Sequence, residues 1–209
     1  MEKIIDMNIK EYMEVLKTDA PAPGGGSVSG ITAAQGIALT LMVTELTIGK
    51  KKYEDMQQLN IEAREEALKI YDKLICAADE DKKAFTELSE AYKLPKETEE
   101  EKEIKKKVLG EKALGATKAP FEVMKLSIKA LEITRSLVGK SNKMAASDLG
   151  VAALNLLAAC KSAWLNVKIN LPYLTDEKAS AEFESRGKEI LKKSEILANE
   201  IYDAVEGTL

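Results

Sequence analysis

Apolar residues recur at helical spacing along almost the whole chain. In the first instance, Asn8 and Glu11 form a capping box, and Ile9, Tyr12 and Met13 follow on one helical face. Longer segments of the same kind are expected at about residues 27–48, 53–92, 98–119, 121–138, 142–169 and 175–205. No segment alternates apolar and polar residues as a half-buried strand would. The pattern predicts one all-α domain over residues 1–209, built as an up-and-down bundle of long helices.

Proline, glycine and capping residues mark the expected helix ends. Ser27 is expected as the N-cap of the second helix, and Thr98 with Glu101 forms another capping box. Pro120 either separates two helices or kinks one long helix. The remaining expected breaks are Pro21, Pro23, Gly49, Pro95 and Gly139.

The segment from Val28 to Ile48 is the most apolar candidate for a membrane span. It carries Gln35 and Glu45, however, and a buried helix of a bundle explains it better. Small residues also gather on one side of this helix, which lets another backbone approach closely. We therefore expect it at the centre of the bundle or at a subunit interface. The small positions are Ser29, Ala33, Gly36, Thr40 and Thr47.

Composition narrows the possible functions. The net charge is −4, so the chain lacks the strongly basic character of a nucleic-acid-binding domain. It has no histidine, which excludes Ser–His–Asp and Cys–His catalysis and the usual zinc sites. Acid–base chemistry would therefore fall to Asp, Glu, Lys, Tyr or Cys. Cys76 and Cys160 are expected to be reduced and buried, and the N-terminus does not resemble a signal peptide.

The stretch APAPGGGSVSG, residues 20–30, places three glycines at the start of a predicted helix. Backbone N–H groups free of side chains at a helix N-terminus can bind an anion. A tight turn that lets two elements pack closely explains the same glycines equally well. The stretch is not a P-loop, because no GK[ST] follows it, and no strand precedes it as in a dinucleotide fold.

Polar residues also form a line on the apolar helix at 142–169. Asp148, Asn155, Ser162 and Asn166 all point to nearly the same side. They either form hydrogen bonds across the bundle or line a ligand cleft, and bundle structure alone favours the first reading. The runs TIGKKKYED and AADEDKKAF, which contain Lys50–Lys52, Asp79 and Asp81, would ordinarily be surface charge.

Four blocks taken together resemble one family. They are PAPGGGSVSG with LTIGKKKYED, DEDKKAFTELSEAYKLPKETEEE, GATKAPFEVMK, and SNKMAASDLGVAALNLLAACKSAWLNVKINLPYL. In this order and spacing they are similar to the formiminotransferase-cyclodeaminase C-terminal family. That family includes cyclodeaminase domains and stand-alone methenyltetrahydrofolate cyclohydrolases. The resemblance covers nearly the whole chain.

The resemblance implies a cytoplasmic helical enzyme acting on a one-carbon tetrahydrofolate. Its expected assembly is a homodimer, with a tetramer as the alternative. The resemblance implies no metal, no cofactor beyond this folate, and no nucleic-acid or membrane partner. Asp148, Asp81 and Lys52 are the expected catalytic residues, with Asp148 as the main proton carrier and Lys52 as an anchor or acid. The expected substrate-binding residues are Gly24, Gly25, Gly26, Ser27, Lys51, Tyr53, Asn142 and Ser147.

Two reactions fit this resemblance. We expect hydrolysis of 5,10-methenyltetrahydrofolate to 10-formyltetrahydrofolate, because the chain carries no formiminotransferase domain. The alternative is cyclodeamination of 5-formiminotetrahydrofolate to 5,10-methenyltetrahydrofolate and ammonia. Either reaction passes through a tetrahedral carbon between N5 and N10, so one cleft could serve both. A non-catalytic helical oligomer is the second alternative.

Overall fold

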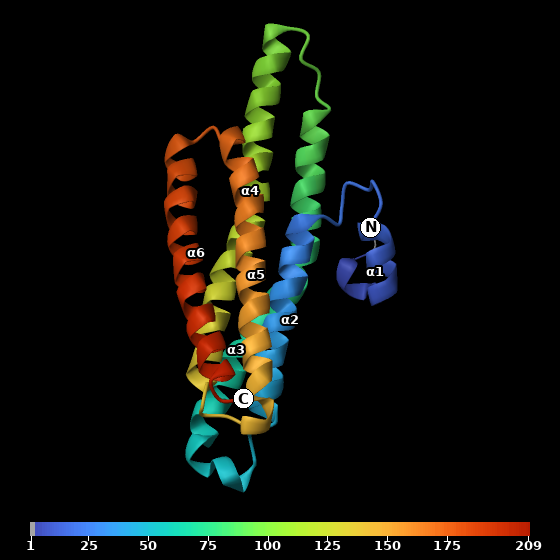
Figure 1. Cartoon of the computed structure of the whole chain (residues 1–209). Coiled ribbons are helices and arrows are strands. Elements are labelled where there is room, and N and C mark those ends of the chain that lie inside the picture. Colours follow the sequence, from blue (N-terminus) through green and yellow to red (C-terminus); the bar gives the residue numbers. More distant parts are fainter. Residues whose placement is uncertain (1–2) are drawn as a thin grey trace.

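The fold consists of six α-helices and four short 3-10 helices within residues 3–209, the part of the chain that the computed structural model describes (Figure 1). No strand occurs in these residues, which confirms the all-α prediction. The α-helices are α1 (Ile9–Leu16), α2 (Gly25–Glu45), α3 (Gln57–Tyr92), α4 (Glu99–Leu137), α5 (Ala146–Asn170) and α6 (Glu177–Glu206). The 3-10 helices are η1 (Ile4–Asp6), η2 (Lys51–Met56), η3 (Lys143–Ala145) and η4 (Leu171–Tyr173).

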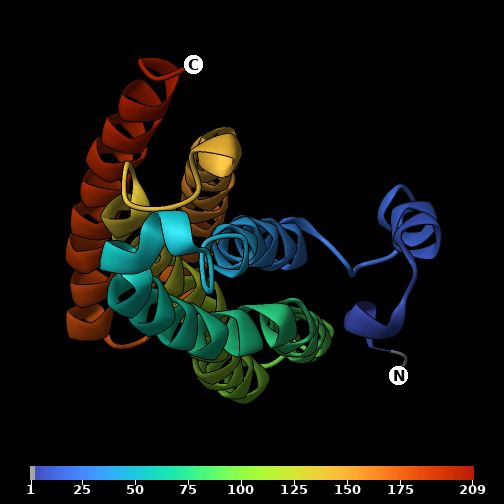
Figure 2. The ribbon, with the colours of Figure 1, turned by 90° about the horizontal axis from the view of Figure 1, so that it is seen from below.

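Helices α2 to α6 run alternately up and down, as the sequence predicts (Figure 1). Helix α5 packs against α2, α4 and α6, and α3 closes the bundle between α2 and α4. Helix α1 stands apart from the bundle beside α2 (Figure 2). It is held by Ile4 and Tyr12, which pack around Ala78 of α3, and by the Ile4 N–H, which donates to Asp79 Oδ1 at 2.7 Å.

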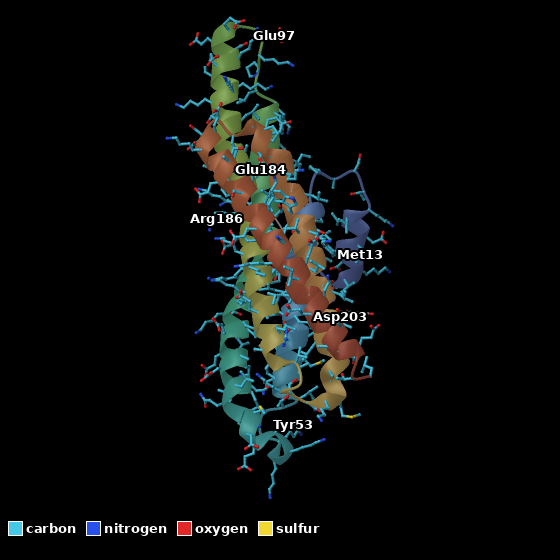
Figure 3. The ribbon with its side chains drawn as sticks, turned by 60° about the vertical axis from the view of Figure 1, so that its left-hand side comes forward. Met13, Tyr53, Glu97, Glu184, Arg186 and Asp203 are labelled. Carbon is cyan, nitrogen blue, oxygen red and sulfur yellow. The ribbon has the colours of Figure 1, made fainter. Side chains whose placement is uncertain are left out.

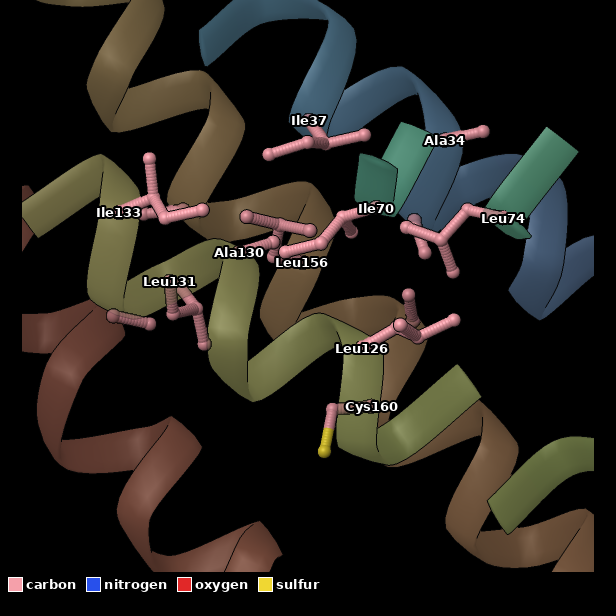
Figure 4. Packing of buried hydrophobic residues seen from close by; sticks show 14 of the residues in the cluster. Ala34, Ile37, Ile70, Leu74, Leu126, Ala130, Leu131, Ile133, Leu156 and Cys160 are labelled. Atoms are coloured by element: carbon pink, nitrogen blue, oxygen red, sulfur yellow. The ribbon is translucent and has the colours of Figure 1, made fainter. Parts of the chain in front are cut away.

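Aliphatic side chains from α2, α3, α4, α5 and α6 form the core (Figure 4). Ile37, Leu74, Leu131 and Leu156 are fully buried there. Burying each such side chain contributes about 1.5–3 kcal/mol relative to leaving it exposed. This burial explains how a chain with only 5% aromatic residues can hold helices of up to 39 residues together.

The small-residue side of α2 lies at the centre of the bundle, as predicted. A Cβ atom on Gly36 would lie 2.7 Å from Leu156 Cγ, so this glycine lets α5 approach α2 closely. Thr40, also on α2, shares a buried hydrogen bond with Thr134 of α4, and their hydroxyl oxygens lie 2.8 Å apart. The small residues on this face of α2 are explained by close packing against α4 and α5 inside the bundle, and no membrane is needed to explain them.

The N-cap expected at Ser27 is wrong, and of the two alternatives at Pro120 the one that separates two helices is excluded. Gly24, in an extended conformation, is the N-cap of α2, and Ser27 lies inside the helix, where its hydroxyl contacts α3 instead. Pro120 does not separate two helices, because α4 continues through it. The proline has no N–H to donate to Ala116 O, but the Asn170 side chain supplies that hydrogen bond at 3.0 Å. The donor thus comes from a neighbouring helix.

The other expected breaks and both capping boxes are confirmed. Asn8 with Glu11 and Thr98 with Glu101 cap α1 and α4 through reciprocal hydrogen bonds. Gly49 and Gly139 take positive φ angles of 76° and 72°, just beyond the ends of α2 and α4. A left-handed conformation of this kind favours glycine.

Both cysteines are free, but only Cys160 is buried as expected. Burial raises the pKa of the Cys160 thiol to about 11, so the thiol stays protonated at neutral pH. Cys76 is exposed on α3, which corrects the expectation of two buried thiols.

Helices α2 and α5 leave apolar side chains uncovered. Both segments are long and apolar enough to cross a membrane. Of the most apolar 18-residue stretch in each segment, 56% is buried in the bundle for α2 and 44% for the segment Lys143–Tyr173, which contains α5. On α5 the exposed apolar residues are separated by three, eleven and four positions, spacings that place all four on one side of the helix as a stripe. This stripe borders the polar line predicted from the sequence. The exposed apolar residues of the two helices are Met42, Leu46, Val151, Leu154, Leu165 and Ile169.

Candidate functional site

The glycine loop meets α3 at Asp81. A Cβ atom on Gly26 would collide with all three atoms of the Asp81 carboxyl group, so the absence of a side chain is what admits this carboxyl. The Ser27 hydroxyl lies 3.1 Å from Asp81 Oδ2 and 3.0 Å from Ala78 O, to which it can donate. Asp81 is therefore held at the N-terminus of α2. Gly26 thus serves a specific close approach, not merely a turn.

Burial raises the pKa of the Asp81 carboxyl above its ordinary value. The hydrogen bonds from the side chain and backbone of Ser27 favour the charged form and act in the opposite direction, but burial has the larger effect. A carboxyl whose pKa is shifted towards neutrality can both accept and return a proton during one reaction.

A pocket of about 190 Å³ opens in front of Asp81. Its wall is formed by the glycine loop, α3, α4 and the C-terminal end of α5. Phe85 supplies an aromatic side chain one turn after Asp81, and Asn166 and Asn170 supply two amides. The pocket thus combines a titratable group, backbone N–H groups at a helix start and side-chain amides. The remaining lining residues are Pro21, Ala22, Gly24, Gly25, Gly26, Ala116 and Ile169.

A second cluster of expected site residues lies at the other end of α2. Asn142 joins two loops there: its backbone N–H donates to Thr47 Oγ1 at 2.9 Å, and its side chain donates to Leu46 O at 3.1 Å. The Tyr53 hydroxyl lies 3.3 Å from Asn142 Oδ1 and accepts from the Lys143 N–H at 3.2 Å. The structure thus brings Tyr53 and Asn142 together, as the family resemblance implies.

Four further expected residues surround this second cluster. Lys51 and Lys52 are exposed on η2, and the Lys52 ammonium lies 5.6 Å from the centre of the Tyr53 ring. Ser147 is exposed and Asp148 is half-buried in the first turn of α5. Cationic side chains and a carboxylate therefore lie around a hydrogen-bonded pair of loops, where an anionic group could be bound.

The two clusters are far apart within one chain. Helix α2 has 21 residues and separates them by about 30 Å. Figure 3 shows Tyr53 at one end of the bundle and Glu97, in the α3–α4 loop, at the other. The expected residues thus divide into a glycine-loop group with Asp81 and a loop group with Lys51, Lys52, Tyr53, Asn142, Ser147 and Asp148. One tetrahydrofolate monoglutamate is too short to touch both groups of the same chain.

The polar line on α5 connects these two ends. Asn155 and Asn166 each donate to the carbonyl four residues earlier in α5, at 2.9 Å, so these amides do not bridge the bundle. Asn166 lines the pocket instead, which supports the cleft reading at that position. Asn170 was not singled out by the sequence reasoning. Its signal was Pro120, whose missing N–H leaves a carbonyl that some donor must satisfy.

Comparison with known proteins gives a consistent family relationship. Residues 8–189 match the family described as formiminotransferase-cyclodeaminase. The chain is 32% identical over 198 residues to the methenyltetrahydrofolate cyclohydrolase of Methylorubrum extorquens, and the match covers 95% of each protein. It is 35% identical over 164 residues to the formimidoyltransferase-cyclodeaminase of Gallus gallus, of which it covers only 30%.

A solved structure shows the same fold. The formiminotetrahydrofolate cyclodeaminase of Thermotoga maritima superposes with a TM-score of 0.80 and is 28% identical in sequence. The match covers 99% of this chain and 98% of the other. The bundle and its connections are therefore shared over their whole length.

Proposed function

Because the chain belongs to the formiminotransferase-cyclodeaminase family, we propose that it is a folate one-carbon enzyme that hydrolyses 5,10-methenyltetrahydrofolate to 10-formyltetrahydrofolate. The observation that carries this proposal is the Asp81 carboxyl, which has a raised pKa and lies beside a pocket at a helix N-terminus. The match to the Methylorubrum extorquens cyclohydrolase spans both proteins almost completely and supports this reaction.

In this proposal Asp81, rather than Asp148 as first expected, is the main proton carrier, because its carboxyl has the raised pKa and borders the pocket. It can supply both proton transfers that the hydrolysis needs. Its carboxylate takes a proton from water as the water oxygen bonds to the cationic carbon between N5 and N10. The resulting carboxylic acid then protonates N5 as the bond from carbon to N5 breaks. The hydroxyl on that carbon loses its proton to solvent and becomes the formyl oxygen on N10. One water is consumed and one proton is released.

Cyclodeamination of 5-formiminotetrahydrofolate is the second candidate. The name and fold of the Thermotoga maritima protein favour it. In this reaction N10 attacks the formimino carbon, and the N10 proton passes to the formimino nitrogen. The acid form of Asp81 then protonates this nitrogen, so that ammonia leaves and the 5,10-methenyl cation remains. Both reactions need a proton carrier beside the same carbon, and the pocket offers the same carboxyl to each.

The active enzyme in this proposal is a homodimer with composite sites. An antiparallel copy docked on the exposed apolar stripes of α2 and α5 brings the loop cluster of one chain to the glycine loop of the other. Asp81, Gly24, Gly25, Gly26 and Ser27 then come from one copy. The second copy supplies Lys51, Lys52, Tyr53, Asn142, Ser147 and Asp148. The ammonium groups of Lys51 and Lys52 then face the carboxylates of the folate glutamate.

The apolar stripes support this arrangement on physical grounds. Leu165 and Ile169 are 67% and 69% exposed, close to the polar line of the same helix. Covering such side chains removes apolar surface from water, at about 25 cal/mol per Å². The polar line would then lie at the edge of the covered surface, beside the composite site. We place the enzyme in the cytoplasm, with its folate substrate as its only small-molecule partner and without a metal.

An absorbance assay with both substrates distinguishes the two reactions. The purified protein is given 5,10-methenyltetrahydrofolate in one cuvette and 5-formiminotetrahydrofolate in another, each against a buffer blank. Loss of the near-ultraviolet methenyl signal above the blank identifies the cyclohydrolase. A rise of that signal with release of ammonia identifies the cyclodeaminase. If the signal changes in neither cuvette, a non-catalytic helical oligomer explains the protein better.

A further inference from the structure

Two asparagines one helical turn apart line the pocket from α5. Asn166 faces the glycine loop: a Cβ atom on Gly25 would lie 3.5 Å from Asn166 Nδ2 and 3.6 Å from its Oδ1. Asn170 follows at the end of the same helix and borders the same pocket. Neither residue belongs to the set that the family resemblance assigned to the site.

The amide nitrogens of both residues are committed to backbone carbonyls. Asn170 Nδ2 donates to Ala116 O at 3.0 Å and to Asn166 O at 2.9 Å. Asn166 Nδ2 donates to Ser162 O at 2.9 Å. Because a carbonyl oxygen can only accept, these contacts fix which side-chain atom is nitrogen and which is oxygen. Each Oδ1 is thereby fixed as well, and neither accepts a hydrogen bond from residues 3–209.

Donors line the same pocket as these two acceptors. The first intrahelical bond of α2 runs from the Val28 N–H to Gly24 O at 3.0 Å. The N–H groups of Gly25 and Gly26 precede it and have no partner in the helix. The pocket is therefore lined both by two fixed amide oxygens and by backbone donors, with the Asp81 carboxyl beside the donors.

We infer that Asn166 and Asn170 bind the N–H edge of the pterin ring of the folate. This inference rests on the proposed function and names the part of the substrate that the pocket takes. The pyrimidine side of a reduced pterin carries two neighbouring donors, N3–H and the 2-amino group, and then the O4 acceptor. The 2-amino group pairs with Asn166 Oδ1 and N3–H with Asn170 Oδ1, and O4 matches the N–H groups of Gly25 and Gly26.

This orientation places the reacting atoms correctly. In a pterin, O4 lies next to N5, so seating O4 on the glycine N–H groups turns N5 towards Asp81. A pocket of about 190 Å³ holds the bicyclic ring but not a whole folate, so the remainder extends out of it. The asparagines then select the ring by hydrogen bonding, and Asp81 acts on N5.

Ligands that differ only at the 2-amino group test the assignment. Binding of 5-formyltetrahydrofolate and of its 2-desamino-2-methyl analogue is measured by titration calorimetry with the full-length protein. The wild type is expected to bind the parent about tenfold more tightly, because the analogue leaves an amide oxygen without its donor. Asn166→Ala is expected to bind both ligands nearly equally.

Asn155→Ala is the matched control. Asn155 lies on the same helix and makes the same hydrogen bond to the carbonyl four residues earlier, but it does not border the pocket. This variant should keep the wild-type preference. Asn166→Asp keeps an oxygen acceptor and should also keep the wild-type preference for the parent ligand. This variant provides a second test of Asn166 if Asn166→Ala folds poorly.

The outcomes separate the inference from the function on which it rests. A wild-type protein that binds neither ligand would contradict the proposed folate site as a whole. A wild type that prefers the parent, with the same preference in Asn166→Ala, would overturn only the role of Asn166. Loss of the preference in Asn166→Ala but not in Asn155→Ala or Asn166→Asp would support it.

Discussion

At the scale of a single residue, the raised pKa of Asp81 affects both the stability of the protein and its proposed chemistry. Because burial raises its pKa in the folded state, the folded protein binds more protons than the unfolded chain between the ordinary and the raised pKa. The contribution of Asp81 to stability therefore falls as the pH rises through this interval. The residue that transfers the proton in the proposed mechanism therefore makes the fold less stable at neutral pH.

Replacing Asp81 with Asn should consequently stabilise the protein at pH 7. The amide keeps an oxygen acceptor for Ser27 but carries no charge to bury. Urea unfolding should show a higher free energy of unfolding than wild type at pH 7 and a smaller difference near about pH 4. Asp72→Asn, an exposed position on the same helix, should show no such pH-dependent difference. Equal stability of Asp81→Asn and wild type at both pH values would contradict the account.

Gly26 and Gly115 form a matched pair of helical glycines. A methyl group at Gly26 would occupy the position of the Asp81 carboxyl, whereas one at Gly115 would meet nothing within 4 Å. Gly26→Ala should therefore lower both stability and turnover. Gly115→Ala should raise stability by about 0.5–1 kcal/mol and leave turnover unchanged. Thermal unfolding and steady-state rates of the two variants check this; equal effects would remove the special role of Gly26.

The sequence predicted residues better than it predicted their partners. Asp81 and the glycines could be identified from motifs, but their contact needs the packing of α2 on α3. Ser27 was misread as a cap because a hydroxyl at a helix start usually binds its own backbone. Here it turns towards Ala78 and Asp81 on another helix. Asn170 went unnoticed because its role depends on a carbonyl of α4, 54 positions away in the sequence.

At the scale of elements, the bond from Asn170 to α4 explains how a 39-residue helix continues through a proline. The sequence allowed either a break or a kink at Pro120. Capping residues and the glycines after helix ends were predicted well, because those signals are local. The sequence could not decide between a break and a continuous α4, because the donor that replaces the missing N–H belongs to α5.

A double-mutant cycle measures this coupling. Asn170→Leu leaves Ala116 O without a donor and should cost about 1–3 kcal/mol of stability. In a Pro120→Ala background the restored N–H can donate to Ala116 O, so the same substitution should cost clearly less. Chemical unfolding of the four proteins gives the coupling energy. Strictly additive effects would show that Asn170 does not serve the proline.

At the scale of the whole molecule, the sequence predicted the bundle but not the placement of the site. Helical periodicity is enough to predict the long helices and their alternating directions. Spacing along the chain cannot show that Lys52 and Asp148 lie about 30 Å from Asp81, because the length of α2 sets that distance. The exposed apolar stripes suggest how a second copy could bring the two clusters together.

Subunit complementation tests the composite site. Asp81→Asn and Asp148→Asn homodimers should each be nearly inactive if each site needs both residues. When the two are mixed and allowed to exchange subunits, half of the dimers become mixed. Each mixed dimer contains one intact site, so about a quarter of wild-type activity should appear. No recovery, despite subunit exchange confirmed by mass spectrometry, would place all the chemistry within one chain.

The most direct test of the central claim is the rate of 5,10-methenyltetrahydrofolate hydrolysis by the wild type and by Asp81→Asn. Absorbance is followed above the buffer-catalysed rate, and circular dichroism establishes that the variant is folded. We expect clear wild-type hydrolysis and a loss in turnover of at least about 10²-fold in the variant. A folded Asp81→Asn protein that hydrolyses the substrate at the wild-type rate would contradict this expectation.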